Sequence, residues 1–94
     1  MIRVIIDRLI AETLEEHYEN TAKETLQVAI KAPGFISGES LRDLHNPRHR
    51  IVLCKWRSEL DWQNWSMSIE RKQMMDKLGV MLEKAESITI LDAP

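Results

Sequence analysis

The residue types in this sequence that could do chemistry include an acid, an aromatic ring and a cation. Asp7 interrupts an apolar run from Ile2 to Ile10, where partial desolvation would raise the pKa of a carboxyl group and make it a better base near neutrality. Trp65 could offer a flat apolar wall to a ring, and Arg71 could stabilise negative charge. Each also has a structural interpretation. Asp7 could form an ion pair with Arg71 or another cation, Trp65 could be core, and Arg71 could extend past apolar neighbours.

The histidines and the single cysteine add little chemistry. His17 lies at the edge of an apolar helical stripe, where it either borders a cleft or is solvated. His45 and His49 flank a polar turn with no carboxylate or thiolate that completes a metal-binding spacing, so we expect no metal site. Cys54 lies within an apolar strand and is expected to be a small buried hydrophobe.

Methionines form another group that could line a site. Met74, Met75 and Met81 fall on one helical stripe. Because methionine adapts its shape, such a group can line an apolar pocket, and Met74 and Met75 are candidate lining residues. Ordinary packing of a helix against a sheet explains the same pattern.

Length and composition restrict the class of protein. Ninety-four residues are enough for one domain, residues 1–94, with no room for a second core. The 13 basic and 15 acidic residues give a net charge of −2, which argues against a nucleic-acid partner. The lone cysteine fits a reducing compartment, and no apolar segment has the length of a signal peptide or a membrane span. We therefore expect a cytoplasmic protein without a membrane partner.

The first half of the chain predicts a strand, a helix and a second strand. Residues 2–10 are rich in Ile and Val on both faces, which is typical of a central strand. Apolar residues then recur at helical spacing over residues 12–32, and Pro33-Gly34 ends this helix. Residues 35–44 follow as a strand, with Gly38 at an expected bulge or close approach.

The second half predicts the complementary set of elements. A polar turn over residues 45–49 leads to a strand at 50–56. Ser58 with Asp61 resembles a capping box, and Ser68 is expected to cap a further helix that carries Arg71 and the methionine stripe. Residues 87–91 supply the last strand.

The predicted order is β-α-β-β-α-β, the ferredoxin-like plan of the α+β class with an antiparallel sheet. Two helices cover only one face of such a sheet. Because the other face also carries apolar residues, we expect a second copy of the chain to cover it.

Several short motifs recur in this order in a known family. The chain resembles the antibiotic biosynthesis monooxygenase (ABM) domain, whose subunits form a dimeric α/β barrel. The matching features are Pro33-Gly34-Phe35 with Gly38 and Glu39, the Asn46-Pro47 turn, Trp56 with Ser58, Trp65, and Ser68 with Arg71.

The resemblance implies a homodimer that oxidises a small aromatic or quinol without a cofactor. Such a reaction needs a proton acceptor, a flat apolar wall and a group that stabilises the anion. By this resemblance Asp7 would be the base, Trp65 would stack on the ring, and Arg71 would hold the anion. His17, Met74 and Met75 would line the pocket.

Non-catalytic binding and haem degradation are the two alternatives to this oxidation. A dimeric binding or structural protein with the same pocket and no catalysis is the main alternative, so the sequence leaves open whether the chain is an enzyme. The haem-degrading branch of the family requires an asparagine on the first strand, a tryptophan after the third, and a histidine about ten positions later. The corresponding residues are Asp7, Trp65 and Met75, and only the tryptophan is kept, so we expect no haem.

Overall fold

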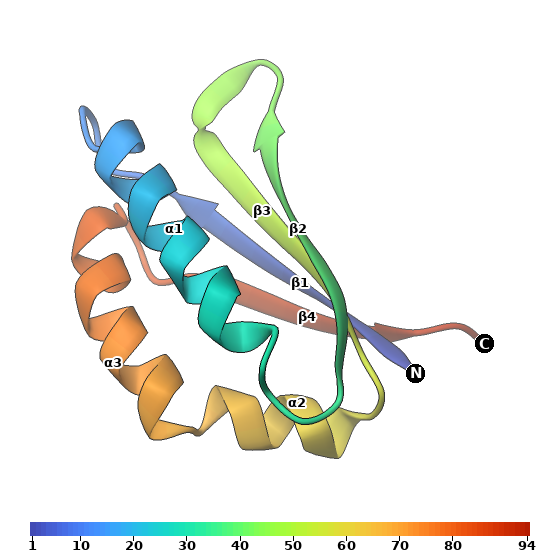
Figure 1. Ribbon diagram of the computed structural model, residues 1–94. Helices are drawn as coiled ribbons and strands as arrows, with labels where there is room; N and C mark the ends of the chain where they lie inside the picture. Colours follow the sequence, from blue (N-terminus) through green and yellow to red (C-terminus); the bar gives the residue numbers. More distant parts are fainter.

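A computed structural model describes all residues, 1–94, as four strands and three α-helices with one 3₁₀ turn. Strands and helices follow one another along the chain in the predicted order (Figure 1). The elements are β1 (Ile2–Leu9), α1 (Glu15–Ala29), β2 (Phe35–Asp43), β3 (Asn46–Trp56), α2 (Glu59–Ser66), α3 (Ile69–Leu78), η1 (Gly79–Met81) and β4 (Ser87–Asp92).

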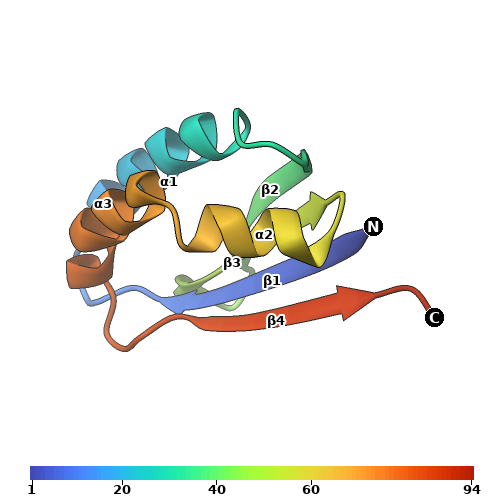
Figure 2. The same ribbon diagram turned by 90° about the horizontal axis from the view of Figure 1, so that it is seen from below.

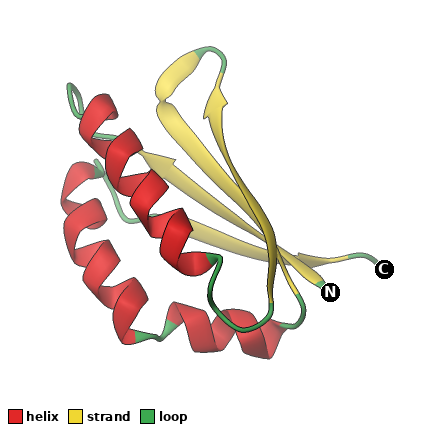
Figure 3. Ribbon diagram, in the orientation of Figure 1, coloured by secondary structure: helices red, strands yellow, loops and turns green.

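The strands form one sheet in the order β2-β3-β1-β4, and every neighbouring pair is antiparallel. This is the ferredoxin-like topology that the sequence predicted. All helices lie on one side of the sheet, which Figures 2 and 3 show from two directions. The other side is left without a covering layer.

The central strand β1 divides its side chains between these two faces. Val4, Ile6 and Arg8 are buried on the helix side, whereas the alternate positions Ile5 and Asp7 lie on the open side. This alternation follows from the two-residue repeat of a strand. It also places a buried arginine, not the neighbouring aspartate, beneath the helices.

Two apolar clusters lie between the helices and the sheet. The larger joins Trp62 and Trp65 of α2 to Trp56 of β3 and to aliphatic residues of β1. The smaller joins Tyr18 of α1 to Leu78 of α3. The helices are thus held at both ends of the sheet.

Several element boundaries differ from those predicted, and three of them have a local explanation. Strand β3 begins at Asn46 and not at Arg50, because Asp43 already pairs with Asn46 and leaves only a tight turn between the strands. Helix α1 begins at Glu15, after Thr13 has taken a left-handed conformation (φ 69°). Helix α3 ends at Leu78, because the chain tightens into a 3₁₀ turn at Gly79.

Both predicted helix caps are confirmed. The Ser58 hydroxyl accepts the backbone N–H of Asp61 at 3.1 Å, and the Ser68 hydroxyl accepts that of Arg71 at 3.2 Å. Each bond satisfies a donor that the first turn of a helix leaves free. The second cap fixes the start of α3, and therefore the position of Arg71.

No helix combines the length and the apolar character that crossing a bilayer requires. The longest, α1, has 15 residues, many of them charged.

The turn between α1 and β2 depends on one glycine. Gly34 has a φ of 85°, and a Cβ at this position would collide with the side chain of Asp61. That side chain is held in place by Arg57 and by the hydroxyl of Ser58. The left-handed backbone and the fixed neighbour both require glycine here.

Gly34→Ala should therefore lower the free energy of unfolding by about 1–3 kcal/mol. Gly79→Ala is the matched control, because Gly79 is helical and a Cβ there meets nothing within 4 Å. This second change should raise stability by about 0.4–1 kcal/mol. Urea unfolding measures the free energy of unfolding of both variants. Equal changes in the two would contradict the role of Gly34.

Candidate functional site

A cavity of about 360 Å³ lies between α1, α2 and the helix side of the sheet. Its wall is mostly apolar, with aromatic rings from β2, β3 and α2 and aliphatic groups from α1, β1 and β3. Arginines from β1, β2, β3 and α3 also line it, together with Glu19 and Lys23 of α1. A concave apolar site with a few charged groups is the usual form of a small-molecule pocket.

The aromatic wall is built around Trp56. Its ring meets Phe35 edge-on at 5.3 Å between centroids and Trp62 at 5.8 Å, and lies nearly parallel to Trp65 at 6.4 Å. Its indole N–H donates to the sulfur of Cys54 at 3.3 Å. The four rings support one another, so the wall is rigid before any ligand arrives.

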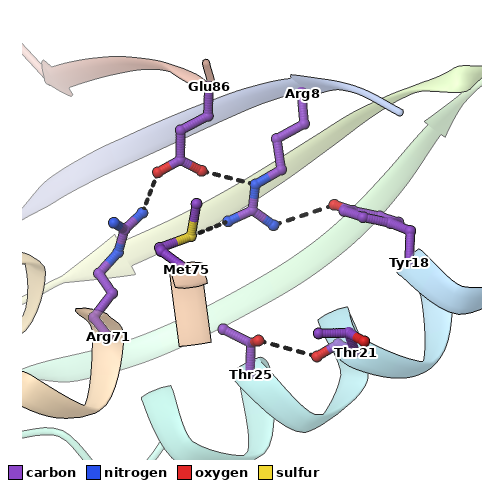
Figure 4. A network of polar contacts seen from close by, with 7 residues as sticks. All are labelled: Arg8, Tyr18, Thr21, Thr25, Arg71, Met75 and Glu86. Atoms are coloured by element: carbon purple, nitrogen blue, oxygen red, sulfur yellow. Dashed lines mark hydrogen bonds and ion pairs between the residues drawn. The ribbon is translucent and has the colours of Figure 1, made fainter. Parts of the chain in front are cut away.

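Beside this wall is a partly buried carboxylate bridge (Figure 4). Glu86, just before β4, accepts Nε of Arg8 at 2.8 Å and an Nη of Arg71 at 2.6 Å, one bond to each carboxylate oxygen. Both guanidiniums line the cavity. The bridge therefore joins β1 to α3 and fixes two positive charges at the cavity.

The charges of this bridge are coupled. Burial alone would raise the pKa of Glu86, but the hydrogen bond with Arg71 and the charges of both arginines outweigh it and hold the pKa below its usual range. Glu86 is therefore ionised at neutral pH. One carboxylate then faces two guanidiniums, so the cluster keeps a positive charge.

Tyr18 and Arg50 extend the polar lining. The Tyr18 hydroxyl accepts from Arg8 at 3.2 Å, and its ring lies between Arg8 and Arg50, at 6.0 and 5.7 Å from their guanidinium carbons. Arg50 donates to the backbone carbonyl of Pro47 and to Glu19. Tyr18 is fully buried, so both arginines are screened from solvent.

Two of the predicted site residues meet in this cavity. Trp65 and Arg71 both line it, and Arg71 lies 5.6 Å from the ring of Trp62. Their catalytic roles stay predictions. The sequence prediction that Asp7 shares this pocket is wrong: Asp7 lies on the open face of the sheet, because the position that points under the helices is Arg8.

Asp7 is paired on the open face with a histidine. Its carboxylate lies 3.0 Å from Nε2 of His49, whose Nδ1 lies 2.8 Å from Asp43. The structural alternative was an ion pair with Arg71 or another cation, and the partner is His49, not Arg71. The hydrogen bonds with Asp43 and then Asp7 raise the pKa of His49 above its usual range.

The other predicted lining residues do not line the cavity. His17 is exposed on α1. Met74 packs against the tryptophan cluster and Met75 against the cluster of Tyr18, so the packing interpretation of the stripe is the correct one. Met75 still approaches the charged bridge, because its sulfur accepts from Arg8 at 4.0 Å.

Sequence reasoning missed three residues of the site: Arg8, Tyr18 and Arg50. Arg8 shares the strand face of Val4 and Ile6, so the two-residue repeat already placed a cation in the core. Arg50 was placed at the start of a strand without a role. Their approach to Tyr18 depends on strand register and on the position of α1, which no local pattern reports.

No three side chains of His, Cys, Asp or Glu lie close enough together to hold a metal ion.

The sequence belongs to a known family. The family model for the antibiotic biosynthesis monooxygenase, ABM, matches residues 1–77, and the chain is a member of that family. A comparison with curated proteins gave no match.

Solved structures agree in fold. A conserved protein from Methanosarcina mazei Go1 has a TM-score of 0.92 at 22% identity, over 99% of this chain and 92% of that one. An antibiotic biosynthesis monooxygenase has a TM-score of 0.91 at 13% identity, over 100% and 99%. A point mutant of SnoaB, described as a cofactor-independent oxygenase from Streptomyces nogalater, has a TM-score of 0.85 at 12% identity, over 98% and 92%. At these identities the likeness concerns the fold alone.

The His49 pair predicts a pH dependence of stability. Because the folded pKa of His49 is raised, its contribution is fully present below about pH 6.5 and is lost as pH rises through the folded pKa. A neutral ring has only one N–H and cannot donate to both carboxylates. His49→Gln should therefore destabilise the protein more at about pH 6 than at about pH 9, measured by urea unfolding. His45→Gln is the control, and the same pH trend in both variants would contradict the assignment.

Proposed function

We propose that the protein is a cofactor-independent monooxygenase acting on a small aromatic or quinol substrate. The observation that carries this proposal is the apolar cavity whose aromatic wall adjoins the guanidiniums of buried Arg8 and partly buried Arg71. Membership of the monooxygenase family supports the same class of reaction.

The chemistry requires the substrate to be ionised. An electron-rich phenol or quinol loses a proton, and the anion passes one electron to O₂. The two radicals combine to a peroxide anion on carbon, which takes up a proton, equal to the one lost from the phenol, to give a hydroperoxide. The hydroperoxide then loses water, together with the hydrogen on that carbon, and leaves a carbonyl. One oxygen atom enters the product and the other leaves as water, so the substrate supplies all the electrons.

The protein's part in this reaction is electrostatic. Arg71 forms one side-chain hydrogen bond, to Glu86, so its other N–H groups are free to donate to a bound phenolate. In a site shielded from water, a fixed guanidinium lowers the pKa of a bound phenol. The lowered pKa of the phenol takes the place of the general base that we expected Asp7 to be. Trp65 would hold the ring against the aromatic wall.

A non-catalytic binding protein is the second candidate. One observation favours it: the only carboxylate that lines the cavity, Glu19, is already paired with Arg50 at 3.0 Å. The site therefore has no unpaired general base. Binding of the same aromatic anions without oxygen consumption would establish this alternative.

Oxygen uptake tests the catalytic proposal. In the presence of a chelator, the protein should accelerate oxygen consumption by members of a panel of anthrones and naphthohydroquinones above their rate of autoxidation. Arg71→Gln should lower kcat/KM by about 10²–10³-fold, because it removes a charged donor to the developing anion.

Lys72→Gln is the matched control, since it removes one positive charge from an exposed position next in sequence. A rate no faster than autoxidation for every compound would overturn the enzyme proposal.

We also propose that the protein is a homodimer joined through the open face of the sheet. This face carries Ile5 of β1 with Ile51 and Leu53 of β3, and the edge strands add Leu41 and Leu91. A second copy would bury this surface, and a stable interface needs about 1,200–2,000 Å². The single free thiol, Cys54, fits a reducing cytoplasm.

Leu53→Arg should break this dimer, because it places a charge at the centre of the apolar face. Light scattering should give the chain mass of 11.0 kDa for this variant and twice that mass for the wild type. Leu60→Arg on the exposed side of α2 is the control and should stay dimeric. A monomeric wild type at micromolar concentration would refute the dimer.

A further inference from the structure

Three arginines stand side by side across the sheet. Arg8 of β1 is paired in register with Arg50 of β3, and Arg50 is paired with Arg42 of β2. Residues in register on antiparallel strands point to the same face. All three line the cavity, so this arginine row (Arg8, Arg50 and Arg42) faces the helix side.

Such a row is unfavourable by itself. Like charges directly opposite each other on neighbouring strands are destabilising. Glu86 is shared between Arg8 and Arg71, Glu19 pairs with Arg50, and Arg42 has no ion pair. The four cavity guanidiniums thus face two carboxylates. The exposed ammonium of Lys23 adds a fifth cation to the lining, so the site keeps three uncompensated positive charges in a chain whose net charge is −2.

The row also has an unused donor group inside the cavity. The side chain of Arg50 is only 5% exposed, yet its Nη2 donates to no atom of the protein. By contrast, Nε, Nη1 and Nη2 of Arg8 all have partners. Because no fully buried side-chain nitrogen lacks a partner, this Nη2 is accessible and free to donate to an anion.

We propose that the arginine row is a binding subsite for a carboxylate group carried by an aromatic ligand. Arg50 and Arg42 present planar, forked donors that match the two oxygens of a carboxylate. On the same face of β3, Val52 and Cys54 lie between Arg50 and Trp56. The ring of the ligand lies along this apolar stretch, with its carboxylate at the row.

Charge balance favours a carboxylate over a phosphate ester. This step rests on the proposed function, in which the substrate also carries a phenolate at Arg71. The phenolate is held by Arg71, and within the row only Arg42 has no ion pair, so the single negative charge of a carboxylate matches it. A phosphate monoester carries up to two negative charges, one more than the single unpaired guanidinium of the row.

Calorimetric titration with a ligand that cannot be oxidised tests the subsite apart from catalysis. The probe is 2-naphthoate, and 2-naphthamide is its neutral counterpart of the same shape. The wild type should bind the carboxylate about tenfold or more tightly than the amide. Arg42→Gln should remove most of that preference and leave amide binding unchanged, whereas Lys72→Gln should bind like the wild type.

Thermal unfolding without ligand gives a second readout. Because Arg42 is exposed and has no partner, Arg42→Gln relieves repulsion within the row. Its unfolding midpoint at low salt should therefore rise, while naphthoate should stabilise it less than it stabilises the wild type. A purely structural role for Arg42 predicts the opposite, a lower midpoint.

The other possible results of the titrations refute different parts of the proposal. Equal binding of naphthoate and naphthamide would refute the subsite and leave the proposed oxygenation intact. Tighter binding of 2-naphthyl phosphate than of 2-naphthoate would refute the carboxylate assignment. No binding of any of the three would refute both the subsite and the cavity as an aromatic site. Carboxylate-selective binding without oxygen uptake would support the subsite and refute only the oxygenase.

Discussion

The structure of the site depends on the burial of Arg8 in a central strand. A guanidinium at this position is tolerated only if its charge and donors are satisfied, and Glu86, Tyr18 and Met75 together do this. Because these partners come from three other parts of the chain, the requirement ties α1, α3 and the start of β4 to β1. The cavity is the space that this arrangement leaves beside β2 and β3.

The aromatic end of the cavity is stabilised by apolar burial and not by ion pairs. The short helix α2 and the end of α1 cover the sheet near Trp56, and the three tryptophans bury a large apolar area with few residues. The result is a stiff wall at one end and a charged lining at the other. An apolar ring and an anionic substituent can therefore be recognised separately within one small chain.

The fold was largely predictable, because β1, α1 and the helix caps at Ser58 and Ser68 each leave a local pattern in the sequence. The site was less so. Trp65 and Arg71 were predicted as site residues, and both line the cavity. Asp7 was predicted as the acidic residue of the site because it interrupts an apolar strand, but the two-residue repeat places Arg8, and not Asp7, on the helix side. The alignment of Arg8, Arg50 and Arg42 requires the register of three strands, which local spacing does not report.

The arginine row shows how stability and function separate in this chain. Arg8 is satisfied by protein groups and Arg50 only in part, while Arg42 has no ion pair, so compensation falls from the centre of the sheet to its edge. A row retained for packing alone would be most stable with a neutral residue at the edge. Uncompensated positive charge instead increases from Arg8 toward Arg42 at the edge of the sheet. This gradient favours entry of an anion, and the buried guanidiniums of Arg8 and Arg50 then fix its orientation.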